Sequence, residues 1–238
     1  MKGNRPVIEP IALGFVNAYI IHGERDVLVD TGLPGMADKL LDELKKRNVS
    51  MQDISLILLT HGHSDHAGNA NELRRRLHVP VAIHALEVEW MRRGLAPIPR
   101  PIRPIGHLIK AITKPNIEPF EPDILLEAGM ALSPYGIAGQ VIHTPGHSPG
   151  SITFLHPEGI GIAGDVLAGS LWRENHPLYP FFADDVPLLH QSIAKLLRAS
   201  VQRVYFGHGR PSSLQEVQRR FAARVASVND LAFSGQHS

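Results

Sequence analysis

Apolar residues along this chain recur at two different spacings, and each spacing predicts a different kind of element. Ala37, Leu40, Leu41 and Leu44 follow the i, i+3, i+4, i+7 pattern of an amphipathic helix. Short runs rich in β-branched residues and bounded by polar turns indicate strands instead. We expect strands at residues 7–13, 15–21, 26–29, 54–59, 80–84, 124–126, 139–143, 151–155, 159–163 and 201–206, and helices at residues 35–48, 69–78, 85–93, 187–199 and 214–227.

The segment 96–122 interrupts this alternation of strands and helices. It contains seven prolines, at positions 97, 99, 101, 104, 115, 119 and 122. Because proline fixes φ and lacks a backbone donor, it bars regular strands and long helices. Long irregular loops in compact domains are more often functional than idle. We therefore expect an insert or lid here, with one short helix at residues 107–113.

Length and charge limit the classes of protein to consider. The 238 residues are enough for one compact domain, which we expect to span residues 1–238. The formal net charge of +1 gives no electrostatic footprint for nucleic acid or for an anionic membrane surface. The N-terminus MKGNRPVIEP has no apolar signal-peptide core, and no continuous apolar stretch approaches the roughly 20 residues that span a bilayer. We expect a cytoplasmic protein without a nucleic-acid or membrane partner.

The stretch THGHSDHAGN, which begins at residue 60, concentrates metal-ligand side chains directly after an apolar run. The chain contains no cysteine, so a metal site must use imidazole and carboxylate ligands. His61 and His63 flank Gly62, which lets the backbone turn sharply, so two imidazole nitrogens can face one point. Asp65 and His66 would face a neighbouring point. The stretch therefore supplies two half-sites.

Each half-site needs further ligands, and three downstream residues have a suitable setting. His147 in TPGHSPGS, Asp165 in GIAGDVLAG and His208 in VYFGHGRP each lie beside glycine where a predicted strand ends. Such loops are where side chains from separate strands can converge. The similarity between THGHS at 60–64 and TPGHS at 144–148 indicates two similar halves whose loops meet at one sheet edge. Of the nine other histidines, we interpret eight as ordinary surface or core residues without this setting: His22, His78, His84, His107, His156, His176, His190 and His237.

On these residues the sequence resembles the metallo-β-lactamase superfamily. The H-x-H-x-D-H signature of that family is matched by His61, His63, Asp65 and His66. The order of the later ligands and the upstream turn VDTG at 29–32 match as well, and the insert is the least similar part. The resemblance implies an α/β fold, the αββα sandwich, in which two mixed β-sheets are flanked by helices. It places the site at the edge of the paired sheets.

The resemblance also implies the ligands of two metal ions. It assigns His61, His63, His147 and Asp165 to the first site, and Asp65, His66, His208 and Asp165 to the second. Asp165 would bridge the ions, and Asp30 would hold the ligand loops through hydrogen bonds, as outer carboxylates commonly do. We expect two divalent ions, with zinc favoured and iron or manganese as alternatives, because His/Asp sites admit all three.

This ligand set predicts a hydrolase. Two divalent ions about 3.5–4 Å apart can share a water and lower its pKa towards about 7. The metal-bridging hydroxide would attack a polarised carbonyl, with Asp65 orienting the hydroxide or accepting its proton. No separate general acid is evident, so bonds with good leaving groups are favoured. We predict a binuclear hydrolase of an ester or thioester, similar to the glyoxalase II-like enzymes.

Other activities of the superfamily are weaker alternatives. N-acyl homoserine lactonases share all seven ligands, but many carry tyrosine three residues after the bridging aspartate, where this chain has Ala168. A true β-lactamase is disfavoured, because the chain has no cysteine ligand, carries Asp165 where such enzymes lack a bridging carboxylate, and shows no export signal. A lactonase is therefore the main alternative. A phosphodiesterase, a mononuclear iron dioxygenase and a non-catalytic metal-binding protein are less favoured.

Two segments supply the candidate substrate pocket. The insert carries more apolar residues than a solvated loop needs, and the loop after Asp165 contains several aromatic residues. An apolar and aromatic wall suits a small-molecule acyl substrate. The alternative for the aromatic cluster is a place in the core or in a homodimer contact. We expect the following side chains to line the pocket: Ile105, Leu108, Ile109, Trp172, Tyr179, Phe181 and Phe182.

Overall fold

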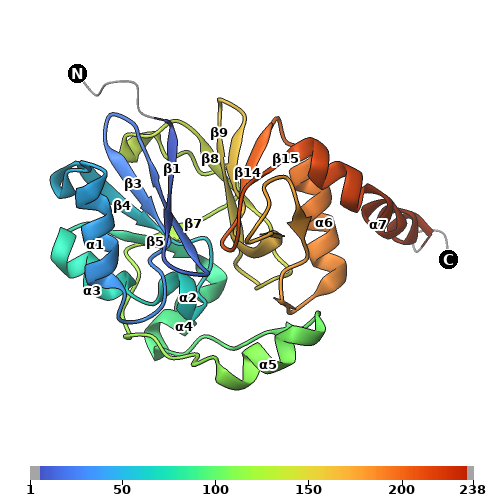
Figure 1. Ribbon diagram of the computed structural model, residues 1–238, viewed down its shortest axis with the longest axis horizontal. Coiled ribbons are helices and arrows are strands. Elements are labelled where there is room, and N and C mark those ends of the chain that lie inside the picture. Colours follow the sequence, from blue (N-terminus) through green and yellow to red (C-terminus); the bar gives the residue numbers. More distant parts are fainter. Residues whose placement is uncertain (1–5, 235–238) are drawn as a thin grey trace.

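The chain folds into four layers, with two β-sheets packed face to face between helices (Figure 1). The computed structural model describes residues 6–234, and their side chains as far as residue 225. In the first sheet the strand order is β1 (Ile8–Ala12), β2 (Asn17–Ile21), β3 (Asp26–Val29), β4 (Ile54–Leu58), β5 (Val81–His84) and β7 (Ile124–Leu126). In the second sheet it is β15 (Ser212–Ser213), β14 (Arg203–Tyr205), β10 (Ile160–Ile162), β9 (Ile152–His156) and β8 (Gln140–His143).

Both sheets are mixed, as predicted. In the first sheet β1, β2 and β3 pair antiparallel, whereas β3, β4, β5 and β7 run parallel. In the second sheet β10 and β14 pair in parallel, and the remaining pairs are antiparallel. The predicted αββα sandwich is confirmed.

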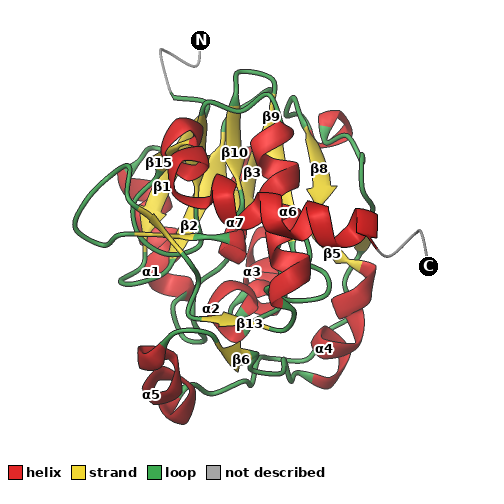
Figure 2. Cartoon of the chain, turned by 90° about the vertical axis from the view of Figure 1, so that its right-hand side faces the viewer, coloured by secondary structure: helices red, strands yellow, loops and turns green. Residues whose placement is uncertain are grey.

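Helices cover the outer face of each sheet. On the first sheet these are α1 (Ala37–Lys46), α3 (Ala70–Leu77) and α4 (Val88–Arg93). On the second sheet, α6 (Val186–Arg198) and α7 (Leu214–Ser234) lie in front of the strands in Figure 2. Shorter elements are α2 (Ser64–Ala67) and the 3₁₀ segments η1 (Met51–Asp53), η2 (Ala85–Glu87), η3 (Ser133–Tyr135) and η4 (Gly164–Val166). Among the helices within residues 6–234, none combines the length and apolar character needed to cross a membrane.

The alternating side chains of the strands divide the core into layers. On β3, Leu28 packs in the cluster between the first sheet and its helices, while Val27 and Val29 pack between the two sheets. A third cluster joins the second sheet to α6 and α7, with Leu189 and Phe221 among its members. Strands with both faces buried explain why the early apolar runs in the sequence are continuous rather than alternating.

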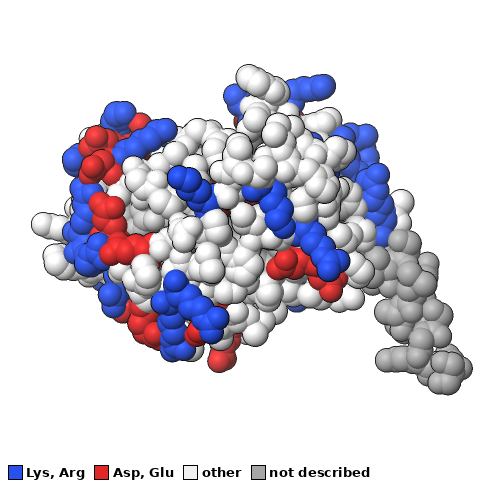
Figure 3. Space-filling model, turned by 90° about the horizontal axis from the view of Figure 1, so that it is seen from below, with Lys and Arg blue, Asp and Glu red and all other residues white. Residues whose placement is uncertain are grey.

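The insert passes beneath the two sheets and carries α5 (Pro104–Ile112), at the bottom of Figure 1. This helix begins at residue 104 rather than at the predicted 107, because proline at the first helical position sacrifices no hydrogen bond and has a suitable φ. Beside it, β6 (Arg100–Pro101) pairs with β13 (Phe182–Ala183), although prolines were expected to prevent strands here. A two-residue pair at an edge tolerates the missing donor. Seen from below, Lys and Arg side chains surround a largely uncharged centre (Figure 3).

Two further features differ from the sequence-based expectations or lie beyond them. The hairpin of β11 (Ala168–Gly169) and β12 (Pro177–Leu178) was not predicted, because two-residue strands carry no periodicity. Residues 1–5, which form half of the N-terminal stretch behind the expected cytoplasmic location, lie outside the described residues.

Candidate metal centre

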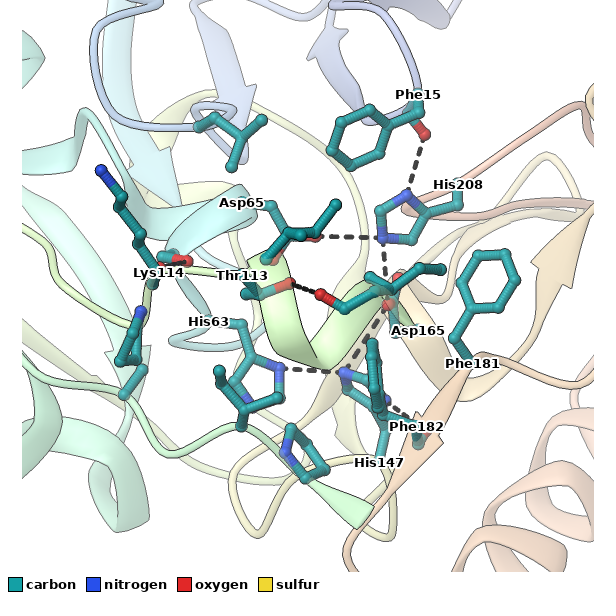
Figure 4. A pocket seen from close by; sticks show the side chains of 18 of the residues that line it. Phe15, His63, Asp65, Thr113, Lys114, His147, Asp165, Phe181, Phe182 and His208 are labelled. Carbon is teal, nitrogen blue, oxygen red and sulfur yellow. Dashed lines mark hydrogen bonds and ion pairs between the residues drawn. The ribbon is translucent and has the colours of Figure 1, made fainter. Parts of the chain in front are cut away.

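All seven predicted ligands come together where strands of the two sheets end. His61 and His63 follow β4, and Asp65 and His66 lie on α2. From the second half, the loop after β8 carries His147, η4 carries Asp165, and the loop after β14 carries His208. Figure 4 shows five of these side chains pointing toward one another from different elements: His63, Asp65, His147, Asp165 and His208.

The Asp165 carboxylate lies between the two predicted ligand sets. Its Oδ2 is 3.6 Å from His147 Nε2 and 3.3 Å from His208 Nε2, while its Oδ1 is 3.6 Å from His66 Nε2. Asp65 Oδ2 is 3.3 Å from the same His208 nitrogen. A carboxylate in this position can reach groups on both sides, as a bridging ligand requires.

Ligand atoms within 4.8 Å of one another form three groups. One contains His61, His63 and His147, and another contains Asp65, His66 and His208, which are the three-residue cores of the predicted sites. The third group joins His61 and His66 to Asp165. The two sites are therefore adjacent and share a boundary formed by these three residues.

Several buried ligand atoms in this cluster have no hydrogen-bond partner among the described residues. They are His61 Nε2, His63 Nε2, His66 Nε2 and Asp165 Oδ1. Leaving a buried polar atom unpaired costs about 1–3 kcal/mol, so the unpaired atoms of His61, His66 and Asp165, whose ligand atoms lie together, call for a bound ion that satisfies them. Imidazole nitrogens and a carboxylate oxygen are the donors that zinc and similar cations accept. The residues fit a metal centre.

Asp30 orients two of the histidines from behind. His66 Nδ1 donates to Asp30 Oδ2 over 2.9 Å, and the Thr60 hydroxyl donates to the same oxygen over 2.8 Å. His61 Nδ1 lies 3.0 Å from that hydroxyl, whose oxygen can accept its proton. The Thr60 amide donates to Asp30 Oδ1. These contacts leave the Nε2 atoms of His61 and His66 facing the centre, and they give Asp30 the supporting position predicted for it.

Backbone carbonyls orient two more histidines in the same way. His147 Nδ1 donates to Phe182 O over 2.9 Å, and His208 Nδ1 donates to Phe15 O over 2.8 Å. His63 differs, because its Nδ1 is the atom that faces His147 Nε2, at 3.0 Å. Its ring stacks on Trp90 of α4 with centroids 5.7 Å apart. Each of the five rings is thus held by a neighbour outside the ligand set or by the facing ligand.

The pKa values follow the charge distribution of the cluster. Burial lowers the pKa of His63 to about 3 and lowers those of His61 and His147 as well, which favours the neutral imidazole that binds metals. Burial also lowers the pKa of His66, but nearby carboxylates raise it by more, to about 9. For His208 too, burial lowers the pKa, but Asp165 and Asp65 raise it by more. The carboxylate side of the site therefore attracts positive charge, either protons or a metal ion.

Sequence reasoning missed two residues that hold the ligand loops. Glu87 is fully buried, and its carboxylate accepts hydrogen bonds from the amides of Gly62 and Gly150, one in each ligand loop. Burial raises the pKa of Glu87 to about 7. Asn69 donates to the carbonyls of Thr31 and Leu33 and so fixes the turn after Asp30. Glu87 gave no signal in its predicted helix, whereas Asn69 ends the motif and could have been noticed.

Gly207 is a third residue without an assigned role in the sequence. A Cβ at this position would collide with Asp165 Oδ1 and with the His66 ring. The glycine beside His208 therefore has a packing reason, which is the close approach of the backbone to the ligands.

A cavity of about 460 Å³ opens over the ligands. Its floor contains the five ligands drawn in Figure 4, and its walls are largely apolar. The wall residues come from loops near the N-terminal strands, from the insert and from the start of β13, and they include Phe15, Leu33, Ile98, Ile109, Phe181 and Phe182. Three of the residues predicted for the pocket, Ile109, Phe181 and Phe182, are in this group.

The predicted pocket is corrected at four other positions. Trp172 is 86% exposed at the turn between β11 and β12. Tyr179 points the other way, where its hydroxyl contacts His190 at 2.7 Å and its ring packs edge-on against Phe221. Ile105 and Leu108 lie on the solvent side of α5, with 47% and 63% exposure. Nearness in sequence to Asp165 or to Ile109 did not determine the direction of these side chains.

Comparisons with known proteins agree with the fold and the motif. The family model described as the metallo-beta-lactamase superfamily matches residues 11–208. The probable metallo-hydrolase MJ0888 of Methanocaldococcus jannaschii is 29% identical over 81% of this chain and 87% of its own length. The hydroxyacylglutathione hydrolase GloC of Haemophilus influenzae is 28% identical over 81% and 84%, respectively.

Two solved structures have a similar fold, and one of them is described as bound to two iron ions. The di-iron-bound form of TTHA1623 has a TM-score of 0.65 and 32% identity, and the match covers 90% of this chain and 98% of that chain. The BLEG-1 B3 metallo-beta-lactamase has a TM-score of 0.68 and 27% identity, covering 90% and 97%. Because the family model spans most of the sequence, this chain belongs to the metallo-beta-lactamase superfamily.

Proposed function

We propose that the protein is a binuclear metal-dependent hydrolase that cleaves an ester or thioester. The observation that carries the proposal is the set of buried, unpartnered ligand atoms of His61, His66 and Asp165, beside an apolar cavity that five of the seven ligands line. When bound, two divalent ions would polarise the substrate carbonyl and supply a nucleophilic hydroxide at neutral pH. The relatives named as the probable metallo-hydrolase MJ0888 and the hydroxyacylglutathione hydrolase GloC support the same class of reaction.

The two ligand sets would hold one ion each. His61, His63 and His147 form the neutral set, and Asp65, His66 and His208 form the set with a carboxylate. Asp165 would contribute to both. The neighbour described as di-iron-bound supports two metal positions, although zinc, iron and manganese all suit His and Asp ligands.

Asp65 is the residue best placed to assist the attacking water. It lines the cavity, and its side chain is 25% exposed. Burial raises its pKa, but His66 and His208 lower it by more, well below the usual range, so the carboxylate is ionised at neutral pH. An ionised carboxylate at the cavity floor can accept a hydrogen bond from the water and orient it towards the substrate carbonyl.

The cavity offers little to protonate a poor leaving group. The Ser64 hydroxyl donates to Lys114 O, and the Thr113 hydroxyl donates to Ile109 O, both over 2.8 Å. Figure 4 shows the Lys114 side chain directed away from the ligand cluster. Thiolates and the anions of acidic alcohols leave with less acid assistance than a simple alkoxide, so thioesters and activated esters are favoured over an alkyl phosphodiester. This favours acyl substrates.

A turnover panel on protein of verified metal content tests the proposal. The panel contains p-nitrophenyl butyrate, S-butyryl-N-acetylcysteamine, a γ-lactone, bis(p-nitrophenyl) phosphate and a chromogenic cephalosporin. We expect the ester and the thioester to give the highest kcat/KM, and Asp165→Asn to lose both metal and rate, because an amide is a neutral and weaker ligand. The surface variant Asp42→Asn, at a side chain 63% exposed, should keep both.

Metal-loaded protein that is inactive on the whole panel, or that acts on the phosphodiester or the cephalosporin alone, would contradict the proposal. A preference for the lactone would favour the lactonase alternative instead. Normal metal content and rate in Asp165→Asn would remove the bridging role of that carboxylate.

A further inference from the structure

We propose that the cavity selects substrates with a hydrophobic acyl chain over peptidic thioesters such as those of glutathione. This inference rests on the proposed ester or thioester hydrolysis and adds the substrate class. It starts from the walls of the cavity, which converge over the ligands from three distant segments. Phe15 lies after β1, Ile98 and Ile109 belong to the insert, and Phe181 precedes β13.

These walls offer few polar contacts to a bound molecule. Apart from the metal ligands, the polar side chains that line the cavity within residues 6–225 are Ser64, Thr113 and Lys114. The two hydroxyls already donate to backbone carbonyls of the insert. A charged peptide such as glutathione, which carries two carboxylates, would lose the hydration of these groups there. Apart from the metal ligands, the only described lining side chain that could pair with a carboxylate as a cation is that of Lys114. Burying unpaired charge is expensive, whereas burying methylenes is favourable.

The cavity is large enough for a substantial acyl group. Its volume of about 460 Å³ lies within the range of roughly 300–1,000 Å³ found for pockets that enclose most of a small-molecule ligand. The ring of Phe15 stacks parallel to the His208 ring, with centroids 5.9 Å apart, so one apolar wall begins directly at a ligand. An acyl chain could therefore extend from the metal centre along apolar surface.

The insert is fastened over the cavity and forms a fixed wall. The β6–β13 pair joins it to the second half of the chain, and Ile102 N donates to Phe181 O over 2.9 Å. Lys110 Nζ donates to Ile98 O over 3.1 Å and thereby ties α5 to the preceding loop. At the other end, Ile117 packs in the core between the first sheet and its helices. A wall held at both ends can set the length of chain that fits.

Helix α5 provides a matched pair of positions for the test. Ile109 lines the cavity, and the adjacent Leu108 is 63% exposed and does not line it. Substitution of either residue by glutamine changes the helix composition equally, but only Ile109→Gln places an amide in the cavity wall. Leu108→Gln is therefore the control for effects on folding and on the attachment of the insert.

The experiment measures kcat/KM for a series of N-acetylcysteamine thioesters with acetyl, butyryl, hexanoyl and octanoyl groups, together with S-D-lactoylglutathione. For the wild type we expect an increase of roughly tenfold for each added pair of methylenes until the cavity is filled. Lactoylglutathione should be poorer than the octanoyl thioester by at least that factor. Ile109→Gln should lose about tenfold on the octanoyl thioester and less than twofold on the acetyl thioester, while Leu108→Gln stays within twofold on both.

Failure of this inference differs from failure of the proposed function. Equal kcat/KM for all chain lengths, or a preference for lactoylglutathione, would overturn the acyl-chain inference and leave the hydrolase intact. Equal losses in the two helix variants would likewise remove α5 from the specificity wall. If metal-loaded protein cleaves no thioester of any length, the acyl-chain inference is wrong, and if it also leaves p-nitrophenyl butyrate intact, the proposed function is wrong too.

Discussion

Replacing Asp30 with asparagine should weaken the metal centre without touching a ligand. The side chain is fully buried, and its Oδ2 accepts from both His66 Nδ1 and the Thr60 hydroxyl. Asparagine can keep the contact between the Thr60 amide and Oδ1, but its NH₂ group would then face two donors. The variant therefore loses the hydrogen bonds that fix His66 directly and His61 through Thr60.

The expected loss can be estimated in two ways. A hydrogen bond to a charged group contributes about 1.5–3 kcal/mol. Removing an outer-shell partner of a metal ligand typically costs 10- to 100-fold in metal affinity, which is about 1.4–2.7 kcal/mol. The two ranges agree. We expect the Kd of the weaker-bound metal to rise 10- to 100-fold in Asp30→Asn, measured by competition with a chromophoric chelator.

A matched control separates this effect from a general loss of charge. Asp38→Asn makes the same chemical change at a side chain that is 84% exposed and pairs with Arg76 on the surface. Its metal affinity should equal that of the wild type. If Asp30→Asn also binds metal within twofold of the wild type, the supporting role of Asp30 is refuted.

Three further predictions concern pH. Metal affinity should increase between pH 6 and 9, and metal binding should release protons, because carboxylates raise the pKa of His66 to about 9 and the ring must lose its proton to bind a metal. A metal affinity that does not change with pH, without proton release, would contradict this. The wild-type kcat/KM should rise with pH through an apparent pKa near 7, the range for water on a catalytic metal, and a flat profile from about pH 5 to 9 would point to another nucleophile. Burial raises the pKa of Glu87 from 4.5 to about 7, so its contribution to stability is present below pH 4.5 and is lost as the pH rises through 7. The free energy of unfolding of Glu87→Gln minus that of the wild type, measured with urea, should therefore rise by up to about 3 kcal/mol between pH 4.5 and 8. A difference that does not change with pH would show that Glu87 does not titrate in this way.

The ligand loops could be predicted because their residues combine chemistry with position in the fold. An apolar run that ends in H-x-H-x-D-H is both a buried strand and a cluster of donors, and strand β4 ends two residues before Thr60. His147, Asp165 and His208 follow the same rule, since each comes after a strand of the second sheet. Strand ends at a common sheet edge bring such residues together.

The pocket walls could not be predicted, because they depend on direction and on distant contacts. Tyr179 follows Asp165 closely in sequence, but contacts with His190 and Phe221 turn it into the layer beneath α6 and α7. Conversely, Phe15 lies far from the insert in sequence and still forms part of the same cavity. Glu87 was hidden for a similar reason, since its function depends on two loop amides that only the fold brings near.

The metal positions themselves provide the most direct test of this account. Crystals of the full chain reconstituted with zinc should be measured at the zinc absorption edge, and the anomalous difference map should contain two peaks per chain. We predict one peak among His61, His63 and His147, another among Asp65, His66 and His208, and Asp165 in contact with both. A single peak, or peaks bound by other residues, would contradict the binuclear centre.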